Sequence, residues 1–205
     1  MAFPAIARQE TLPVTRRTFD PKRFKEDCRA AVAAGGAIQA QVEELLKREM
    51  ADPAAVLAGL GAPTKGALTA LYRSPELTIL NIVWSPLMQL LPHDHNLWAL
   101  IGIYTGREDN IFWRRGPEKL QAVGATAISI GDVVSLPVDV IHSVSNPLEK
   151  FTGAIHVYGG DYFGVHRSEW DPESLTERDW NIQEAVKTFE RYNERSRPAA
   201  ACPTS

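Results

Sequence analysis

The sequence has few cysteines and lacks both a long apolar run and a basic stripe. Only Cys28 and Cys202 are cysteines, near opposite ends of the 205 residues, so no disulfide framework is expected. No stretch approaches the roughly 18 apolar residues of a membrane span, and the first residues do not resemble a signal peptide. The net charge is −3, and no basic residues interleave with aromatic ones, which argues against nucleic acid as a partner. These absences predict a reduced, cytoplasmic protein without membrane or nucleic-acid partners.

The composition and the spacing of apolar residues change twice along the chain. Residues 1–19 are polar, whereas two or three helices are expected between residues 20 and 60 because apolar residues recur there at helical spacing. Two of these helices have Asp-Pro starts, at Asp20 and Asp52, and both end in glycine. We therefore divide the chain into an arm and helical cap over 1–65, a barrel over 66–168, and a C-terminal helix and tail over 169–205, all within one structural domain.

The middle of the chain has the pattern of short strands. Segments rich in Ile, Val, Tyr, Trp and Thr are separated by Gly, Pro, Asn and Asp, and no helical pattern lies between them. The clearest of them are 77–86, 97–106, 125–137, 139–147 and 151–160. This spacing predicts an all-β class, as an antiparallel sandwich or barrel, and the chain after Trp170 again predicts helix.

A His-x-His pair stands out in the segment "LPHDHNLWALIGIYTG". Alternate residues of a strand point to one face, so His93 and His95 are expected to project together while Asp94 points the other way. Metal sites built on such a pair often have a carboxylate a few residues later, and here that stretch is apolar. The pair alone fits a metal site or two solvated imidazoles equally well.

A second segment, "GDVVSLPVDVIHSVSNP", resembles the second motif of the cupins. Its glycine, proline, histidine and asparagine stand at the family's spacing, with Asp139 in place of a second glycine: Gly131, Pro137, His142 and Asn146. The first cupin motif is matched at His93, His95 and Gly106, and its glutamate position holds Ala99. The resemblance implies a double-stranded β-helix, or jelly-roll, barrel in which His93, His95 and His142 bind a metal.

Loss of the glutamate with retention of three histidines resembles the thiol dioxygenases, the family of cysteine dioxygenase and 3-mercaptopropionate dioxygenase. The resemblance covers about residues 68–168 and implies a role for four further side chains: His156 and Tyr158 as a catalytic pair, and Arg73 or Arg167 as the carboxylate-binding arginine. Two positions depart from the family. Ala99 excludes the thioether cross-link of the animal enzymes, and Ala154 replaces the serine of Ser-x-His-x-Tyr.

The resemblance implies an Fe(II)-dependent dioxygenase that oxidises a small mercapto-carboxylate to its sulfinate with O2, as a monomer or small homo-oligomer. Three neutral imidazoles add no negative charge to Fe(II), so the centre is expected to attract an anionic ligand such as a thiolate. An arginine fork suits the carboxylate of that substrate.

Other interpretations stay open at the level of sequence. His142 could be a core histidine, Arg73 could pair with Glu76 or another surface acid, and Arg167 could lie on a solvated face. His166 fits no ligand spacing. For the whole protein, the alternatives are a three-histidine cupin dioxygenase with a non-thiol substrate, and a non-catalytic metal-containing cupin that binds a small acid.

Overall fold

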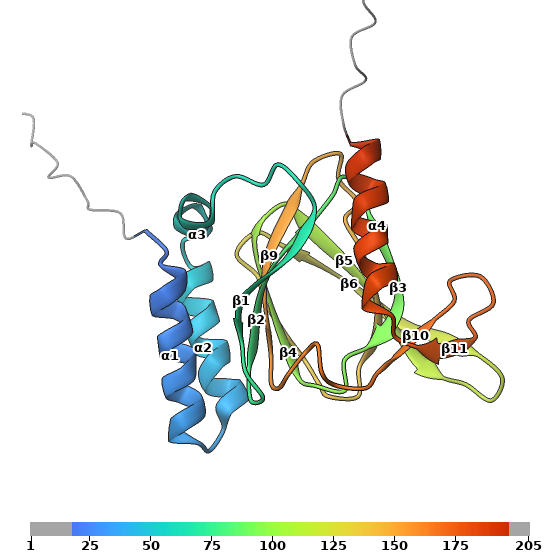
Figure 1. Ribbon diagram of the computed structural model, residues 1–205, viewed down its shortest axis with the longest axis horizontal. Coiled ribbons are helices and arrows are strands. Elements are labelled where there is room, and N and C mark those ends of the chain that lie inside the picture. Colours follow the sequence, from blue (N-terminus) through green and yellow to red (C-terminus); the bar gives the residue numbers. More distant parts are fainter. Residues whose placement is uncertain (1–17, 197–205) are drawn as a thin grey trace, which may run out of the picture.

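The computed structural model describes residues 18–196, in which two β-sheets face one another between helices at either end (Figure 1). Most of the predicted N-terminal arm and most of the tail lie outside the described residues. Within the described range, no helix is both long enough and apolar enough to cross a membrane.

Three helices precede the sheets, as the sequence predicts: α1 (Pro21–Ala34), α2 (Ile38–Met50) and α3 (Pro53–Leu60). The Asp20 carboxylate accepts a hydrogen bond from Lys22 N at 2.9 Å, and that of Asp52 accepts one from Ala55 N at 3.1 Å. Both aspartates therefore cap a helix whose first residue is proline. The helices cover the outer face of one sheet, because α2 and α3 lie against β4 (Figure 1).

The strands form two antiparallel sheets. The first has the order β1-β2-β9-β4-β7 and consists of β1 (Ala67–Arg73), β2 (Thr78–Trp84), β9 (Thr152–Tyr158), β4 (Ala99–Thr105) and β7 (Val133–Leu136). The second has the order β11-β10-β3-β8-β5-β6 and consists of β11 (Glu177–Asp179), β10 (Ser168–Trp170), β3 (Gln89–Asp94), β8 (Ile141–Ser145), β5 (Arg107–Arg115) and β6 (Leu120–Ser129). Each segment predicted as a strand contains one, but segment 125–137 is divided by a turn into the end of β6 and the strand β7, which lie in different sheets. The polar strand β5 and the short strands β10 and β11 were not predicted.

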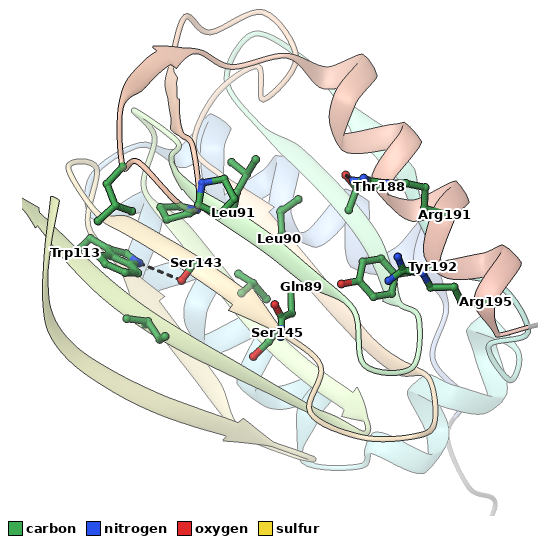
Figure 2. A pocket seen from close by; sticks show the side chains of 15 residues that line it. Gln89, Leu90, Leu91, Trp113, Ser143, Ser145, Thr188, Arg191, Tyr192 and Arg195 are labelled. Atoms are coloured by element: carbon green, nitrogen blue, oxygen red, sulfur yellow. Dashed lines mark hydrogen bonds between the residues drawn. The ribbon is translucent and has the colours of Figure 1, made fainter. Parts of the chain in front are cut away.

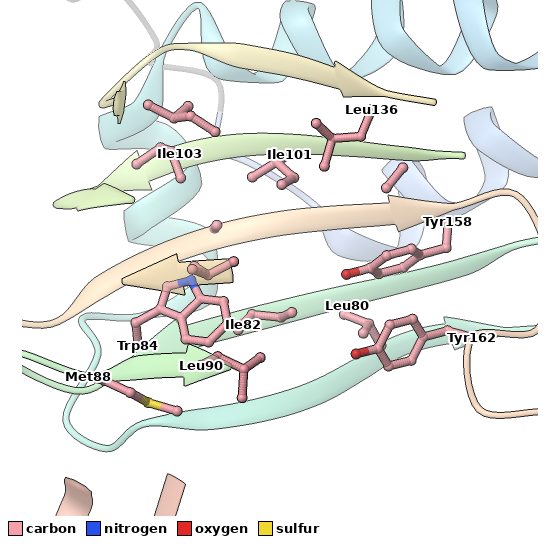
Figure 3. Packing of buried hydrophobic residues seen from close by; sticks show 14 of the residues in the cluster. Leu80, Ile82, Trp84, Met88, Leu90, Ile101, Ile103, Leu136, Tyr158 and Tyr162 are labelled. Atoms are coloured by element: carbon pink, nitrogen blue, oxygen red, sulfur yellow. The ribbon is translucent and has the colours of Figure 1, made fainter. Parts of the chain in front are cut away.

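The central strands β2, β9 and β4 of the first sheet are buried on both faces, so their residues alternate between two cores. In β9, Ile155 and Val157 pack with the N-terminal helices, whereas Ala154 and Tyr158 belong to the core between the sheets. Figure 3 shows this inner core, with Trp84 and Tyr158 from neighbouring strands of the first sheet. The same alternation turns His156 inward, because it lies between Ile155 and Val157 on the strand.

The closed jelly-roll barrel expected from the sequence is not observed, since the two sheets share no strand pairing. The C-terminal helix α4 (Ile182–Arg195) lies across an open side instead. Its Phe189 ring stacks on Trp84 with centroids 5.5 Å apart, and its Asn193 amide bonds both N and O of Gly66. A helix, rather than a strand pair, therefore completes this wall of the core.

Helix α4 is shorter than the sequence predicts, since the helical pattern of the sequence begins at Asp171 and the helix begins at Ile182. The Asp171 carboxylate accepts hydrogen bonds from the backbone of Glu173 and Ser174, so it stabilises a turn rather than a helix start. Residues 177–179 then pair with β10, and helix α4 begins after the capping residue Asn181. The hairpin β10–β11 thus adds two strands beside β3, the strand that carries His93.

Gly106, the glycine of the first cupin motif, occupies a position that excludes a side chain. Its φ is 82°, and a Cβ there would lie 2.1 Å from Thr152 Oγ1. We expect Gly106→Ala to lower the free energy of unfolding by at least about 2 kcal/mol, because left-handed strain and a clash combine. Urea denaturation measures this change. Gly124→Ala is the matched control, since its Cβ would meet nothing within 4 Å; an equal loss in both variants would contradict the explanation.

Candidate metal centre

Three histidines from the second sheet converge between the two sheets. His93 on β3 stands directly opposite His142 on β8, and His95 follows β3 by one residue. The Nε2 atom of His95 lies 3.3 Å from Nε2 of His93 and 3.2 Å from Nε2 of His142. All three rings are buried, at 1–3% exposure. The structure therefore brings together the three residues that the two motifs predicted as ligands.

This spacing fits a single metal ion. Imidazole nitrogens bind a divalent metal at about 2.1 Å, so two neighbouring ligand atoms lie roughly 3.0 to 3.4 Å apart in octahedral or tetrahedral geometry. No other group of three or more His, Cys, Asp or Glu side chains within residues 18–196 has the geometry of a metal site. The cluster is thus the candidate metal centre.

Hydrogen bonds on the far side of two rings set which nitrogen is free. Nδ1 of His93 lies 3.0 Å from the Leu91 carbonyl oxygen, and Nδ1 of His142 lies 2.6 Å from Oδ1 of Asn110. A carbonyl oxygen can only accept, so both Nδ1 atoms carry the proton and both Nε2 atoms present a lone pair. In the described structure, Nδ1 of the buried His95 has no partner. Two Nε2 lone pairs and the Nε2 atom of His95 therefore converge on one point, as the ligands of a metal ion do.

The three imidazoles are neutral at physiological pH. Burial lowers the pKa of His93 to about 4, despite the opposing hydrogen bond to Leu91. Burial also lowers the pKa of His95 and His142 well below the usual value, and the neighbouring histidines contribute in the same direction. A metal ion entering this centre therefore displaces few protons.

Asp94, between two of the ligands, points away from the centre as the strand pattern predicts. Its carboxylate accepts a hydrogen bond from Ser168 N at 2.8 Å and lies 3.5 Å from Nη2 of Arg115. Ser168 follows Arg167 directly, so the aspartate of the His-x-His motif ties the segment that carries Arg167 to the metal centre.

Arg167 lies in the interior, not on a solvated face. It is 3% exposed, and its guanidinium is stacked between the rings of Tyr162 at 3.8 Å and Trp180 at 4.4 Å. Within the described residues, its Nε and Nη1 atoms have no hydrogen-bond partner. Its charge also contributes to the lowered pKa of His93 and His95, behind the larger effect of burial. A buried, unpaired cation beside the histidines is suited to an anionic ligand.

Arg73 lies at the surface instead. Its Nε and Nη2 atoms donate to the two carboxylate oxygens of Asp161 at 2.7 and 2.8 Å, and half of its side chain is exposed. The structure therefore distinguishes the two arginines that the sequence left as alternatives. Arg73 is paired with an acid, whereas Nε and Nη1 of Arg167 have no partner within residues 18–196.

His156 and Tyr158 form a pair next to the centre. His156 Nδ1 lies 3.2 Å from the Tyr158 hydroxyl, and the rings of Tyr158 and His95 are 5.0 Å apart. Burial raises the pKa of Tyr158 well above its usual value, and neighbouring Tyr162 raises it further, so the phenol stays protonated at neutral pH. Ala99 is the strand partner of Tyr158, so the vacant glutamate position of the motif lies beside this tyrosine.

Four residues around the centre were not identified from the sequence. Glu108 and Asn110 lie on the overlooked strand β5, where their side chains hydrogen-bond one another behind His142 and His156. Tyr162 and Trp180 hold the Arg167 guanidinium. The charged and polar pattern of 107–110 could have suggested a solvent-facing strand, whereas Glu108 is in fact 0% exposed. His166, by contrast, is exposed, in line with its lack of ligand spacing.

A wider hollow lies away from this centre. It is a groove of about 450 Å³ between α4 and the strands β3, β5 and β8 (Figure 2). None of the residues lining the groove is His, Cys, Asp or Glu, so it offers no metal ligand or general base of these types. The three histidines line a separate, narrow cavity together with His156, Tyr158, Tyr162 and Trp180. The chemistry therefore belongs to the inner cavity.

Known structures with a related arrangement include cupins, although no protein-family profile matches the chain. One is an RmlC-like cupin from Methanocaldococcus jannaschii with a double-stranded β-helix fold. It is 15% identical in sequence, and the match covers 50% of this chain and 86% of that protein, at a TM-score of 0.42. A cupin superfamily protein from Desulfitobacterium hafniense is 14% identical, and the match covers 52% of this chain and 88% of that protein, at a TM-score of 0.41. Oxalate decarboxylase from Bacillus subtilis is 18% identical, and the match covers 44% of this chain and 22% of that protein, at a TM-score of 0.37. At these scores the likeness does not establish a family, and the case for the site rests on its own geometry.

The ligand assignment makes a direct prediction for metal content. Replacing His142 by Ala should reduce bound metal by roughly tenfold or more, because one of three ligands is lost. Metal analysis of protein loaded anaerobically with Fe(II) measures the change. His166→Ala, which removes an exposed histidine, should bind as the parent does. Equal metal content in the His142→Ala variant and the parent would refute the assignment.

The neutral state of the ligands predicts a pH dependence for the metal-free protein. The unfolded chain has a histidine pKa of about 6.5, and folding lowers the pKa of His93 to about 4. Between these values the unfolded chain binds more protons, so stability is present above pH 6.5 and is lost as the pH falls toward 4. His93 alone should make the free energy of unfolding about 2 kcal/mol smaller at pH 5 than at pH 7.

Urea denaturation of the metal-free protein at the two pH values tests this effect. The loss should shrink in His93→Asn, whose side chain does not titrate, and persist in His166→Ala. A parent protein as stable at pH 5 as at pH 7 would contradict the burial of neutral imidazoles.

Proposed function

We propose that this protein is an Fe(II)-dependent thiol dioxygenase that oxidises a small mercapto-carboxylate to its sulfinate. The supporting observation is a centre of three neutral imidazoles with a buried, unpaired Arg167 nearby. In the overall reaction, a thiolate and O2 give a sulfinate, with both oxygen atoms on sulfur. When bound, Fe(II) would supply the site at which thiolate and O2 meet, held by His93, His95 and His142.

The charge of the centre favours a thiolate substrate. The vacant glutamate position holds Ala99, so none of the three candidate ligands is a carboxylate that would lower the charge of a divalent metal. A thiol that binds such a metal loses its proton, and the negative sulfur then supplies the charge that the protein omits.

Arg167 would bind the carboxylate of the substrate. Its guanidinium is stacked on two rings, so its orientation is fixed, and its Nε and Nη1 are available as donors. A planar fork held in this way suits a carboxylate, and satisfying two buried donors adds to the affinity. Trp180 Nε1, also buried without a partner in the described structure, is a further donor on this wall.

Tyr158 and His156 would act on the oxygen side of the reaction. The Tyr158 hydroxyl stays protonated at neutral pH, and it is placed by His156 at 3.2 Å. A fixed phenol beside the ligands can hydrogen-bond a polar group of the substrate and exclude water. Since Ala99 is its strand partner, Tyr158 acts without a thioether cross-link.

A three-histidine cupin dioxygenase that acts on a non-thiol acid is the second candidate. The observation in its favour is Ala154, which is fully buried and brings no hydroxyl to the position where the resembled family has serine. A non-catalytic cupin that binds a small acid through Arg167 would share the centre and differ only in its lack of O2 uptake.

Oxygen uptake distinguishes these functions. The Fe(II)-loaded protein should consume O2 with cysteine, mercaptopropionate or mercaptosuccinate and release the matching sulfinate, detected by mass spectrometry. Cysteamine, which lacks a carboxylate, should be a poorer substrate because it cannot use Arg167. Metal binding without O2 uptake on any thiol would remove the proposal.

The carboxylate assignment predicts a difference between the two arginines. Arg167→Met should raise KM for the best mercapto-carboxylate by roughly 10- to 100-fold, the value of a charged hydrogen bond. It should change the rate with cysteamine far less. Arg73→Met is the matched control, and its kinetics should resemble those of the parent because Arg73 is paired with Asp161. If Arg73→Met shows the larger defect, the assignment is reversed.

A further inference from the structure

Glu108 is a buried carboxylate whose role lies outside the functions assigned so far. It is 0% exposed and lies on β5, behind the histidine cavity rather than in it. Its Oε2 accepts a hydrogen bond from Trp84 Nε1 at 2.8 Å, and its Oε1 accepts one from Asn110 Nδ2 at 3.0 Å. Oε2 also lies 3.5 Å from Nε2 of His156, an ion-pair distance too long for a hydrogen bond, and this Nε2 has no hydrogen-bond partner among the described residues. The carboxylate therefore accepts two hydrogen bonds and faces a third nitrogen.

The first connection leads to the metal ligand His142. Because the Asn110 NH2 group donates to Glu108, the amide oxygen of Asn110 must face the other way, toward Nδ1 of His142 at 2.6 Å. An oxygen at this place accepts only, so it requires the proton of His142 on Nδ1. That leaves the Nε2 lone pair free for a metal. Reversing the Asn110 amide would put the proton on the wrong nitrogen.

The second connection leads to Tyr158. The negative oxygen 3.5 Å from His156 Nε2 favours a proton on Nε2 through charge attraction, without a hydrogen bond. A ring whose single proton is on Nε2 has a lone pair on Nδ1, which accepts the hydrogen bond from the Tyr158 hydroxyl, 3.2 Å away. Because the hydroxyl proton of Tyr158 is donated to His156, the phenol oxygen faces the cavity as a hydrogen-bond acceptor.

The charge of Glu108 is maintained despite its burial. Burial alone would raise the pKa of this carboxyl, but the donors of His156, Asn110 and Trp84 outweigh it and lower the pKa. Ala154 offers His156 no side-chain hydrogen bond, so Glu108 is the polar partner on that side of the ring.

We propose that Glu108 is a positioning residue that fixes the proton positions of His142 and His156 together, and so couples metal affinity to the hydrogen bond of Tyr158. The proposal rests on the proposed metal site for its first half only. It assigns Glu108 no contact with substrate or metal, and it predicts that the two histidines change their protonated nitrogen when the carboxylate is replaced.

Glu108→Gln is the decisive variant, because it keeps the shape and alters the donors. The amide oxygen of the glutamine is expected at the position of Oε2, where Trp84 Nε1 donates. The new NH2 group then lies against the NH2 group of Asn110. Asn110 must then reverse, and its NH2 group faces Nδ1 of His142. We expect Fe(II) or Co(II) affinity to fall roughly 10- to 100-fold, as for the loss of other groups that orient a metal ligand.

A second substitution should restore the site. When Glu108→Gln is combined with Asn110→Asp, the new NH2 group donates to one oxygen of the introduced aspartate, and the other oxygen accepts from His142 Nδ1. Affinity should return to within about threefold of the parent, an uncertainty typical for single interactions. Glu49→Gln, a buried carboxylate on α2 far from the cavity, is the matched control and should bind metal normally.

Two measurements test the proposal on the full chain: titration with Co(II) followed by its absorption, and ¹⁵N NMR of the histidine rings in metal-free protein. The parent should show Nδ1–H for His142 and Nε2–H for His156, and His142 should change to Nε2–H in Glu108→Gln alone. Unchanged His142 protonation and metal affinity in folded Glu108→Gln would overturn it.

If Glu108→Gln does not fold, Asn110→Ala serves instead: metal affinity should fall while His156 keeps Nε2–H, and unchanged affinity would overturn the connection. Failure of the parent to bind Co(II) would refute the proposed metal function, whereas the NMR result would still decide the role of Glu108.

Discussion

The structure depends on the burial of three neutral imidazoles whose Nε2 atoms face one another. The Nε2 atoms of His93, His95 and His142 lie only 3.2 to 3.3 Å apart along two edges of the cluster, and a proton on His95 Nε2 can serve only one of its two neighbours at a time. The strand pairing between β3 and β8 holds them in place, because His93 and His142 are directly opposite residues. The fold therefore holds three ligand atoms in place before a metal binds, so a divalent cation bound there would stabilise the folded state.

The surroundings of this cluster place opposite charges on different sides of it. Glu108 lies behind His142 and His156, held by nitrogen donors, whereas Arg167 lies with Tyr162 and Trp180 on the side of the outer hairpin. The carboxylate is saturated by the protein, and the guanidinium retains free donors. Each charge thus has a distinct use: the negative one orients protein groups, and the positive one is left for a ligand.

Strand alternation made much of this site predictable from the sequence. The inward direction of His93 and His156 follows from a period of two, and Asp-Pro caps located the N-terminal helices. The sequence could not show that Glu108 is buried, because β5 has charges on both sides and burial depends on the strand paired with it. Nor could it show the burial of Arg167, which depends on hairpin β10–β11 folding back so that Tyr162 and Trp180 stack on opposite sides of the guanidinium. Closure by α4 likewise depends on tertiary packing of Phe189 on Trp84.

The balance of charge explains why the carboxylate lies behind the ligands rather than among them. Glu108 and Arg167 cancel each other, and the three imidazoles are neutral, so a divalent metal would leave the cavity with two uncompensated positive charges. A ligand with two negative groups, a thiolate at the metal and a carboxylate at Arg167, neutralises that excess. A glutamate at the Ala99 position would remove one positive charge and favour a monoanion instead. The placement of Glu108 outside the ligand set therefore supports the proposed mercapto-carboxylate, which would bind as a dianion.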